Sequence, residues 1–242
     1  MLTLQNKTAI VTGAGRGIGK AIALAYAEAG ANVALVARTR PQLEQVAAQI
    51  TAAGRRALVI AADVTDPAGV AGMVNATLAE FGTIDILVNN AGMARSQPVL
   101  EMSLDDWNRT MTTNLTSVFL CSQAVCRHMI ERRQGKIINI SSGSGVRGSP
   151  GNAVYSASKA GVIAFTEALA GEVRQFGVQV NVICPGPVNT EMLAQRPHNE
   201  TPAQNVTALE PAEIAGLALY LASDSSGRIS AQRFLARVTN RW

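Results

Sequence analysis

Short apolar runs alternate with longer stretches of helical periodicity along almost the whole of this 242-residue chain. The runs are rich in valine and isoleucine: KTAIVT, NVALVA, RRALVIAADV, IDILVNNAG, GKIINIS and VQVNVICPG. Continuous apolar strands that alternate with helices are typical of a parallel sheet covered by helices on both faces. The pattern therefore predicts an α/β fold, a doubly wound parallel sheet of the Rossmann type.

The same alternation predicts a single domain over residues 1–242, because no linker, repeat or low-complexity stretch interrupts it. The chain is 48% hydrophobic, which suffices for one sizeable core. Glycine, proline and aspartate mark the ends of the expected helices. Helices are expected over residues 17–30, 41–54, 66–82, 103–132 and 210–223, with a further helix that carries Tyr155.

The net charge of +4 does not indicate a nucleic-acid partner. No acidic residue follows Asp224, whereas Arg228, Arg233, Arg237 and Arg241 do, so these four arginines equal the whole excess. No apolar run reaches the length of a membrane span, and no signal peptide is evident. We therefore expect no membrane and no nucleic-acid partner, and a cytoplasmic location.

Cysteine and histidine usage point to a reducing compartment and to no metal site. The three cysteines are an odd number, which argues for buried free thiols rather than a disulfide framework. His128 and His198 lie in no metal-ligand spacing.

The glycine-rich string TGAGRGIG, residues 12–19, joins the first expected strand to the first expected helix. Such a loop lets the backbone approach a pyrophosphate at the positive end of a helix. A merely tight turn is the alternative, but the strand before and the helix after favour a dinucleotide site. The residues expected to contact the cofactor here are Gly13, Gly15, Arg16, Gly17, Ile18 and Gly19.

The residue after the second strand normally distinguishes the two nicotinamide dinucleotides. An acid there binds the ribose 2′-hydroxyl, whereas an arginine accepts a 2′-phosphate. Here Ala37, Arg38 and Thr39 occupy the position, and Arg16 could close on the same phosphate. A solvated surface charge is the alternative for Arg38. The missing acid favours NADP(H) over NAD(H).

The string YSASK places Lys159 four residues after Tyr155. On a helix these two side chains share one face, so an ammonium group can lie beside a phenol. An accidental spacing of two common residues is the alternative.

Seven motifs occur in a fixed order and together resemble the short-chain dehydrogenase/reductase family. They are TGAGRGIG, DV at 63–64, NNAG at 89–92, TNLTSVF around Asn114, Ser142, YSASK and PGPVNT, and the resemblance runs to about Ser226. Each lies at the carboxyl end of an expected strand or in the adjoining helix, where open α/β sheets bind ligands.

The resemblance implies an oxidoreductase in which Tyr155 donates the proton, Lys159 acidifies it, Ser142 holds the carbonyl oxygen and Asn114 holds a water against the lysine. It assigns no role to the neighbouring Ser141 and Ser144. Asn89 is implied to brace the fourth strand. It further implies cofactor contacts from Asp63, Val64, Asn90, Ala91, Gly92, Tyr155, Lys159, Pro185, Gly186, Val188 and Thr190.

The electrostatics of such a pair are adequate for the chemistry. Bringing a phenol from a pKa of ~10 towards neutrality corresponds to ~4 kcal/mol. A unit charge at ~4 Å supplies about that much at an effective dielectric constant of ~20. Desolvation opposes it, so the lysine is expected to need help from the oxidised nicotinamide and the Asn114 water.

The strings NNAGMARS, TNLTSVF and ERRQGKIINIS resemble the 3-oxoacyl-[acyl-carrier-protein] reductases within the family. The substrate implied is an acyl thioester or another small molecule. Arg132 and Arg133 could meet an acidic carrier protein, although Phe176 stands where a basic residue is common. A reductase of small ketones, sugars or polyols, and a non-catalytic NADP-binding regulatory protein, are the alternatives.

Residues 227–242 depart from the family pattern, which has a glycine, a final strand and an Asp-Gly-Gly turn. Ala231 stands in place of the glycine, and the turn is absent. We expect no final strand here but an apolar helical face formed by Ala231, Phe234, Leu235, Val238 and Trp242. A tetramer should then be weakened, leaving a homodimer through the helices that bear Asn114 and Tyr155. The segment after Thr190 is shorter than the family's substrate lid, which predicts a more open site.

Overall fold

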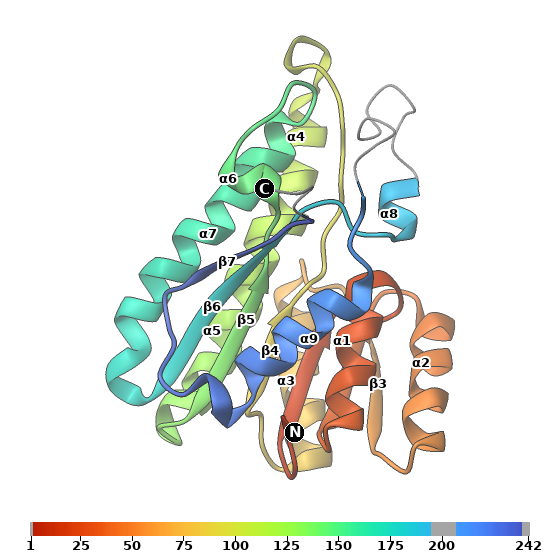
Figure 1. The fold of residues 1–242 in the computed structure, drawn as a ribbon, viewed down its shortest axis with the longest axis vertical. Coiled ribbons are helices and arrows are strands. Elements are labelled where there is room, and N and C mark those ends of the chain that lie inside the picture. The colour runs from red at the N-terminus through yellow and green to blue at the C-terminus, as the bar shows by residue number, and fades with distance from the viewer. Residues whose placement is uncertain (1, 195–206, 239–242) are drawn as a thin grey trace.

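The computed structural model describes residues 2–194 and 207–238. Seven parallel strands form one sheet in the order β3-β2-β1-β4-β5-β6-β7 (Figure 1). The strands are β1 (Thr8–Thr12), β2 (Asn32–Ala37), β3 (Ala57–Ala61), β4 (Ile86–Asn89), β5 (Gly135–Ile140), β6 (Val178–Pro185) and β7 (Arg233–Ala236). The predicted doubly wound parallel sheet is confirmed.

Helices connect these strands and cover both faces of the sheet. They are α1 (Gly17–Glu28), α2 (Arg40–Ala52), α3 (Pro67–Phe81), α4 (Leu104–Met111), α5 (Ser117–Glu131), α6 (Gly143–Val146), α7 (Ala153–Val173), α8 (Glu191–Ala194) and α9 (Pro211–Ala222). Short 3-10 turns span Val99–Glu101, Arg174–Phe176 and Asp224–Ser226.

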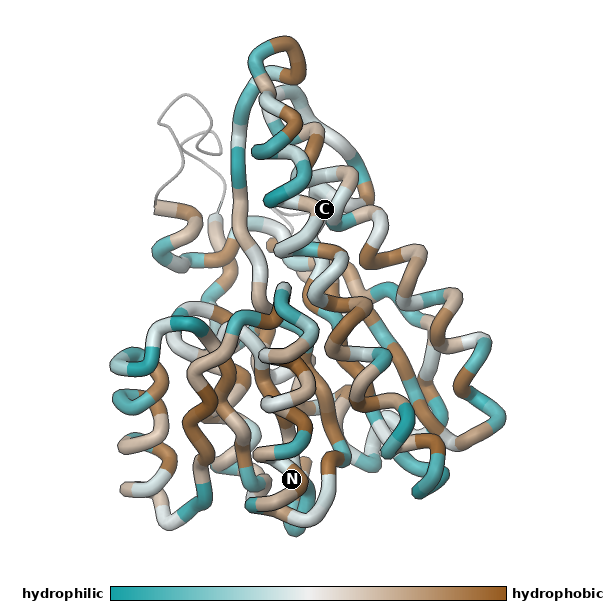
Figure 2. Tube along the Cα trace, turned by 180° about the vertical axis from the view of Figure 1, so that it is seen from behind, coloured by the Kyte–Doolittle hydropathy of each residue, from teal (hydrophilic) through white to brown (hydrophobic). Residues whose placement is uncertain are grey.

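Two apolar layers hold the helices against the sheet. Neighbouring residues of a strand point to opposite faces, so Val11 enters the layer under α1 and α9 while Ile10 enters the layer under α3 and α5. Figure 2 shows the hydrophobic residues running along the central strands. The buried Tyr26 hydroxyl donates to the carbonyl of Ala218 at 3.0 Å and ties α1 to α9. The strands are thus fixed from both sides, and their carboxyl ends form a stable edge.

The helix predicted over residues 103–132 is interrupted in the structure. It begins after Ser103, whose hydroxyl accepts from the backbone N–H of Asp106 at 3.1 Å. A π-helical stretch, Thr112–Thr116, separates α4 from α5 and contains the buried Asn114. Such stretches insert an extra residue into a turn and are frequent at functional sites. The sequence pattern of residues 103–132 predicts one continuous helix and does not reveal this interruption.

The expectation that no final strand forms after Ser226 is wrong. Strand β7 pairs in parallel with β6, from Val182 opposite Arg233 to Pro185 opposite Ala236. Phe234 and Leu235 therefore lie on a strand and not on a helical face, and Ala231 and Val238 flank it. Trp242 lies outside the described residues.

The buried Asn181 explains why the strand forms despite its arginines. Its side chain accepts from the N–H of Gln232 at 3.1 Å and donates to the carbonyl of Ile229 at 2.9 Å. The backbone N–H of Ala231 also donates to Val180 at 2.9 Å. Because the strand is present, the argument that its absence weakens a tetramer fails.

Candidate active site

A cleft of about 640 Å³ opens at the carboxyl ends of β1, β2, β3 and β4. It is lined by the glycine loop, by the residues that follow β2, β3 and β4, by one end of α4 and by the start of α8. The lining residues are Gly13, Gly15, Arg16, Gly17, Ile18, Val36, Ala37, Arg38, Thr39, Gln42, Ala62, Asp63, Val64, Thr65, Asn90, Ala91, Gly92, Asn108, Arg109, Thr112, Thr113, Thr190, Glu191 and Met192.

The glycine loop fits a phosphate group closely. Gly13 and Gly17 have φ angles of 66° and 54°, which favour glycine. Gly19 lies beneath the loop, and a methyl group there would collide with the carbonyl of Gly13 and the side chain of Asn90. No side chain caps α1 and no acid lies in its first turn, so its N–H groups are available to an anion.

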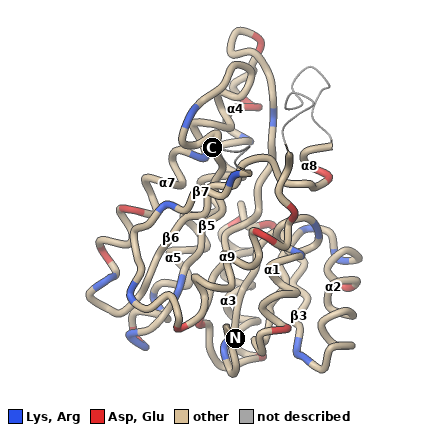
Figure 3. Tube along the Cα trace, in the orientation of Figure 1, with Lys and Arg blue, Asp and Glu red and all other residues tan. Residues whose placement is uncertain are grey.

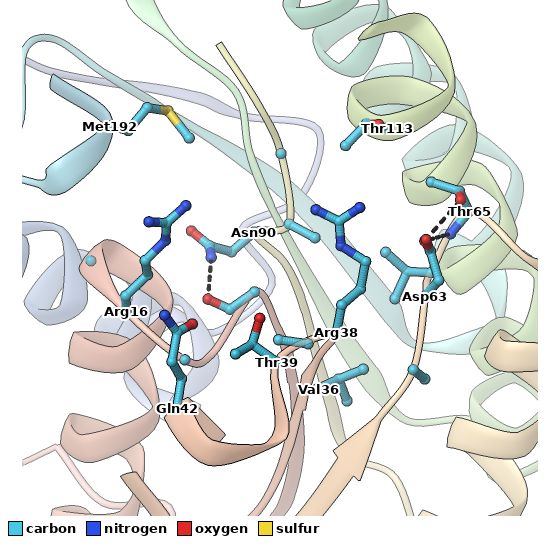
Figure 4. Close-up of a pocket in the computed structure, with 18 of the residues that line it drawn as sticks. Arg16, Val36, Arg38, Thr39, Gln42, Asp63, Thr65, Asn90, Thr113 and Met192 are labelled. Carbon is cyan, nitrogen blue, oxygen red and sulfur yellow. Dashed lines mark hydrogen bonds between the residues drawn. The ribbon is translucent and has the colours of Figure 1, made fainter. Parts of the chain in front are cut away.

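Thr12 and Asn90 clamp this loop to the neighbouring strand. The Thr12 hydroxyl accepts from the N–H groups of Asn90 and Ala91 at 3.0 and 3.1 Å and donates to Val88. The Asn90 amide donates to the carbonyls of Thr12 and Gly13 (Figure 4). These contacts fix the loop before any ligand binds.

Two arginines face the cleft at its nucleotide end. In Figure 4 Arg16 and Arg38 extend towards it from opposite sides, with Asn90 between them. The side chain of Asp63 lies nearby and accepts from the backbone and the hydroxyl of Thr65 at 2.9 and 2.8 Å. These hydrogen bonds, with a smaller contribution from Arg38, lower the pKa of the Asp63 carboxyl. Both arginines thus line the same cleft, and their closing on one phosphate stays a prediction.

Tyr155 and Lys159 lie on one face of α7, as their spacing predicted. Both are buried, and the lysine Nζ lies 6.0 Å from the centre of the tyrosine ring. Nζ donates to the carbonyl of Ile140 at 2.9 Å, at the end of β5. Burial lowers the pKa of Lys159 to about 8. The ammonium form therefore predominates at neutral pH, although it loses its proton more readily than an exposed lysine does.

Asn114 connects this pair to the cleft. Its Oδ1 accepts from the N–H of Met93 at 2.8 Å, and its Nδ2 donates to Met93 and to the Ser158 hydroxyl. Gly92, which lines the cleft, lies against it: a methyl group there would stand 3.2 Å from Asn114 Oδ1 and 3.5 Å from Lys159 Nζ. The lysine therefore lies directly behind the wall of the cleft.

Ser142 follows β5 and begins α6, where its hydroxyl accepts from the N–H of Ser144 at 3.1 Å. The neighbouring Ser141, to which the sequence assigned no role, donates to the carbonyl of Lys159 at 2.7 Å. It ties the turn of α7 that contains Lys159 to the end of β5. A methyl group on Gly145 would meet the same carbonyl at 2.8 Å, so α6 packs closely on α7.

Several predicted cofactor residues lie beside the cleft and not in its wall. Pro185 and Gly186 end β6, and Val188 forms a bridge with Leu209. Thr190 does line the cleft, and its methyl group would lie 3.2 Å from a methyl group on Gly17.

Sequence reasoning missed other parts of the wall. Gln42 comes from the first turn of α2, Thr65 follows Asp63 by two residues, and Met192 lies on α8. The missed residues on α4 and the π-helical stretch are Asn108, Arg109, Thr112 and Thr113. The sequence feature that could have indicated these four residues was their position shortly before Asn114.

Two further features bear on the earlier expectations. All three cysteines, Cys121, Cys126 and Cys184, are buried free thiols, as predicted. Within the described part of the chain, no helix is both long and apolar enough to cross a membrane.

Comparison with known proteins identifies the family to which this fold belongs. Residues 7–201 match the family model of the short chain dehydrogenases, so the chain belongs to that family and is an oxidoreductase.

Individual relatives and structures are similar over nearly the full length. A 3-oxoacyl-[acyl-carrier-protein] reductase of Synechocystis is 42% identical over 240 residues, covering 97% of this chain and 96% of the relative. A (2S)-[(R)-hydroxy(phenyl)methyl]succinyl-CoA dehydrogenase subunit of Thauera aromatica is 40% identical, with 95% and 94% covered. A short-chain type dehydrogenase/reductase from Mycobacterium marinum superposes with a TM-score of 0.92 at 40% identity, covering 98% and 96%.

Proposed function

We propose that this protein is an NADPH-dependent reductase that converts a carbonyl group, best a 3-oxoacyl thioester, into an alcohol. The observation that carries the proposal is the position of Lys159. Its ammonium group lies on one helix face with Tyr155 and directly behind Gly92 in the cleft wall. Tyr155 would thus give its proton close to the end of the dinucleotide cleft at Gly92.

The cleft fits a dinucleotide that carries an additional phosphate. The glycine loop and the uncapped start of α1 would hold the pyrophosphate, and Asp63 would accept from the adenine amino group. Arg16 and Arg38 would bind a 2′-phosphate, since no acid follows β2 to favour a free hydroxyl. NADP(H) is therefore the proposed cofactor. When bound, it supplies the hydride.

The protein's own residues manage the proton and the developing charge. Ser142 would hold the carbonyl oxygen by a hydrogen bond as negative charge grows on it. The Tyr155 hydroxyl would give its proton to that oxygen, and Lys159 would stabilise the phenolate left behind. The alcohol leaves, and solvent returns a proton to the tyrosine.

The return path for that proton would pass Lys159 and Asn114. Both amide hydrogens of Asn114 are engaged, one by Met93 and one by Ser158. A water between the two residues would therefore accept from the ammonium and donate to Oδ1, which has accepted one N–H and keeps a second lone pair.

The proposed substrate class rests on the substrates of similar proteins and on a changed view of Arg132. The relatives' names describe 3-oxoacyl and succinyl-CoA substrates, both thioesters. Arg132, offered above as a carrier-protein contact, is bonded to Asp85 at 3.0 Å and is not free for a partner. A small thioester therefore fits as well as one attached to a carrier protein. Small ketones are the second candidate.

A panel of carbonyl compounds tests the proposal. NADPH oxidation is measured with acetoacetyl thioesters, diketones and sugars. Thioesters are expected to give the highest kcat/KM. Turnover of sugars alone would remove the thioester assignment, and oxidation with none of the compounds would favour a non-catalytic role.

We also propose a homodimer formed through α5 and α7. Phe119 on α5 is 41% exposed and makes an edge-to-face contact with Phe165 on α7, with ring centres 6.4 Å apart. Exposed aromatic pairs of this kind are enriched at interfaces. Light scattering should show a dimer that Phe119→Glu dissociates; an unchanged mass in the variant would exclude this surface.

A further inference from the structure

Arg237 lies at the substrate end of the site, although its sequence position gave no hint of this. Strand β7 pairs Ala236 with Pro185, and the N–H of Gly186 donates to the Ala236 carbonyl at 2.7 Å. Arg237 is thus the first residue beyond the strand. It follows the carboxyl end of β7, and the carboxyl end of β5, on the same side of the sheet, leads into the segment that carries Ser142 (Figure 1).

The side chain of Arg237 runs along two glycines. Its Cγ lies 3.5 Å from where a methyl group on Gly186 would stand. Its Nη2 and Nε lie 3.4 and 3.7 Å from the corresponding position on Gly143. Gly143 directly follows Ser142, so the guanidinium lies against the chain segment that carries the serine. It stands beside the group proposed to hold the carbonyl oxygen.

This guanidinium has no ion pair or hydrogen bond with another described residue, whereas Arg233 on the same strand pairs with Glu167 at 3.4 Å. The surrounding chain offers no acid: residues 132–166, 173–190 and 225–242 contain neither aspartate nor glutamate. Figure 3 shows the resulting absence of acidic residues along β5, β6 and β7. The chain segments that end beside Arg237 therefore bring no carboxylate of their own to its guanidinium.

We propose that Arg237 is a specificity residue that binds a carboxylate of the substrate close to the carbonyl being reduced. A guanidinium fork matches a carboxylate in a bidentate way, and the contact is charge-assisted. A neutral ketone gains nothing from it. This inference rests on the proposed reductase function, and it narrows the substrate to a ketone, a 3-oxoacyl thioester included, whose acyl part also carries a free carboxylate.

Matched substrate pairs test the inference. Acetoacetate and methyl acetoacetate share one ketone but differ in charge, and 4-oxopentanoate with its methyl ester places the charge one carbon further away. We expect the wild type to prefer the acid over the ester in kcat/KM in at least one pair. Arg237→Gln should reduce that preference by about 10- to 100-fold. Arg237→Lys should restore part of it, because it keeps the charge but not the fork.

Arg233→Gln is the matched control, since it removes the same charge four residues earlier, on β7 and away from Gly143. It should leave both ratios unchanged. Equal losses in the two glutamine variants, or unchanged ratios in Arg237→Gln, would overturn the inference.

A binding measurement separates this inference from the proposed function. Calorimetry of each acid with the NADP⁺ complex requires no turnover. If no ketone is reduced, the reductase proposal fails, and the calorimetry still decides about Arg237. Tighter binding of the acid to wild type than to Arg237→Gln supports its role, and equal binding contradicts it.

Discussion

The nucleotide end and the catalytic end of the site lie on one sheet edge but are built differently. Arg16 and Arg38 are exposed side chains around a loop of glycines. Asn114, Tyr155 and Lys159 are buried; Asn114 accepts from the loop at Met93, and Lys159 donates to the end of β5. The first end can change its ligand preference without disturbing the fold, whereas a change at the second end alters chemistry and stability together.

The charges at the two ends also differ in how they affect the stability of the ligand-free protein. The exposed arginines are screened by water, so they contribute favourable free energy only when a phosphate group binds between them. The Lys159 ammonium is desolvated permanently and is stabilised by the Ile140 carbonyl. Keeping this cation buried beside Tyr155 therefore lowers the stability of the folded state.

The sharpest consequence is a pH-dependent stability that Lys159 confers on the ligand-free protein. In the folded protein the pKa of Lys159 is about 8, against 10.5 for a freely solvated lysine. Below pH 8 both states hold the proton, and the burial cost is fully present. Between these two values the folded state loses the proton first, so the wild type should gain stability as pH rises, by roughly 3 kcal/mol relative to Lys159→Met. Urea unfolding at several pH values measures this difference, and a constant difference across the window would contradict the buried-ammonium account.

A smaller effect is expected when the nucleotide end is changed. The double variant Ala37→Asp/Arg38→Leu supplies the missing acid and removes one guanidinium. We expect NADPH affinity to fall and the ratio of NADPH to NADH affinity to drop by about 10- to 100-fold, with unfolding nearly unaffected. Fluorescence titration gives both dissociation constants.

Arg40→Leu serves as the control, because Arg40 is exposed and pairs with Glu44 at 3.8 Å, away from the cleft wall. It should preserve the ratio. Equal or tighter binding of NADH by the wild type would refute the 2′-phosphate site.

The smallest effect concerns the last strand. Ala231 has a φ of 60°, in the left-handed region that favours glycine. Ala231→Gly should therefore stabilise the protein by about 0.5–1 kcal/mol, since relief of strain exceeds the added chain entropy. Thermal unfolding measures it. Ala53→Gly, at a residue with a φ of −83°, should instead destabilise, and the same sign in both variants would show that the backbone conformation is not the cause.

The parts of the fold that could be predicted depend on local signals. Apolar runs bounded by glycine identified the first six strands, and Asp66 with Pro67 marked the start of α3, where the aspartate accepts from two backbone N–H groups. The glycine loop was recognisable because its conformation requires glycine. The Tyr155 and Lys159 spacing sufficed because helix geometry alone brings them together.

The parts that could not be predicted depend on distant partners. Strand β7 is short and half-exposed, and it is held by the side chain of Asn181 about 50 residues earlier. The roles of Thr12 and Ser141 arise from hydrogen bonds to Asn90 and Lys159 that no local pattern encodes. Arg237 reaches the site only because that strand pairs in this register.

The central claim is that Tyr155 supplies the proton while the dinucleotide cleft is independent of it. Tyr155→Phe removes only the hydroxyl, so NADPH affinity and the unfolding midpoint should remain near wild type. Turnover of the best ketone in the panel should fall by about 10²–10⁴-fold, the range that general acid catalysis contributes. The measurement is kcat beside the NADPH dissociation constant, both on the same preparation. Loss of turnover with intact binding supports the account, and an unchanged kcat in Tyr155→Phe would contradict it.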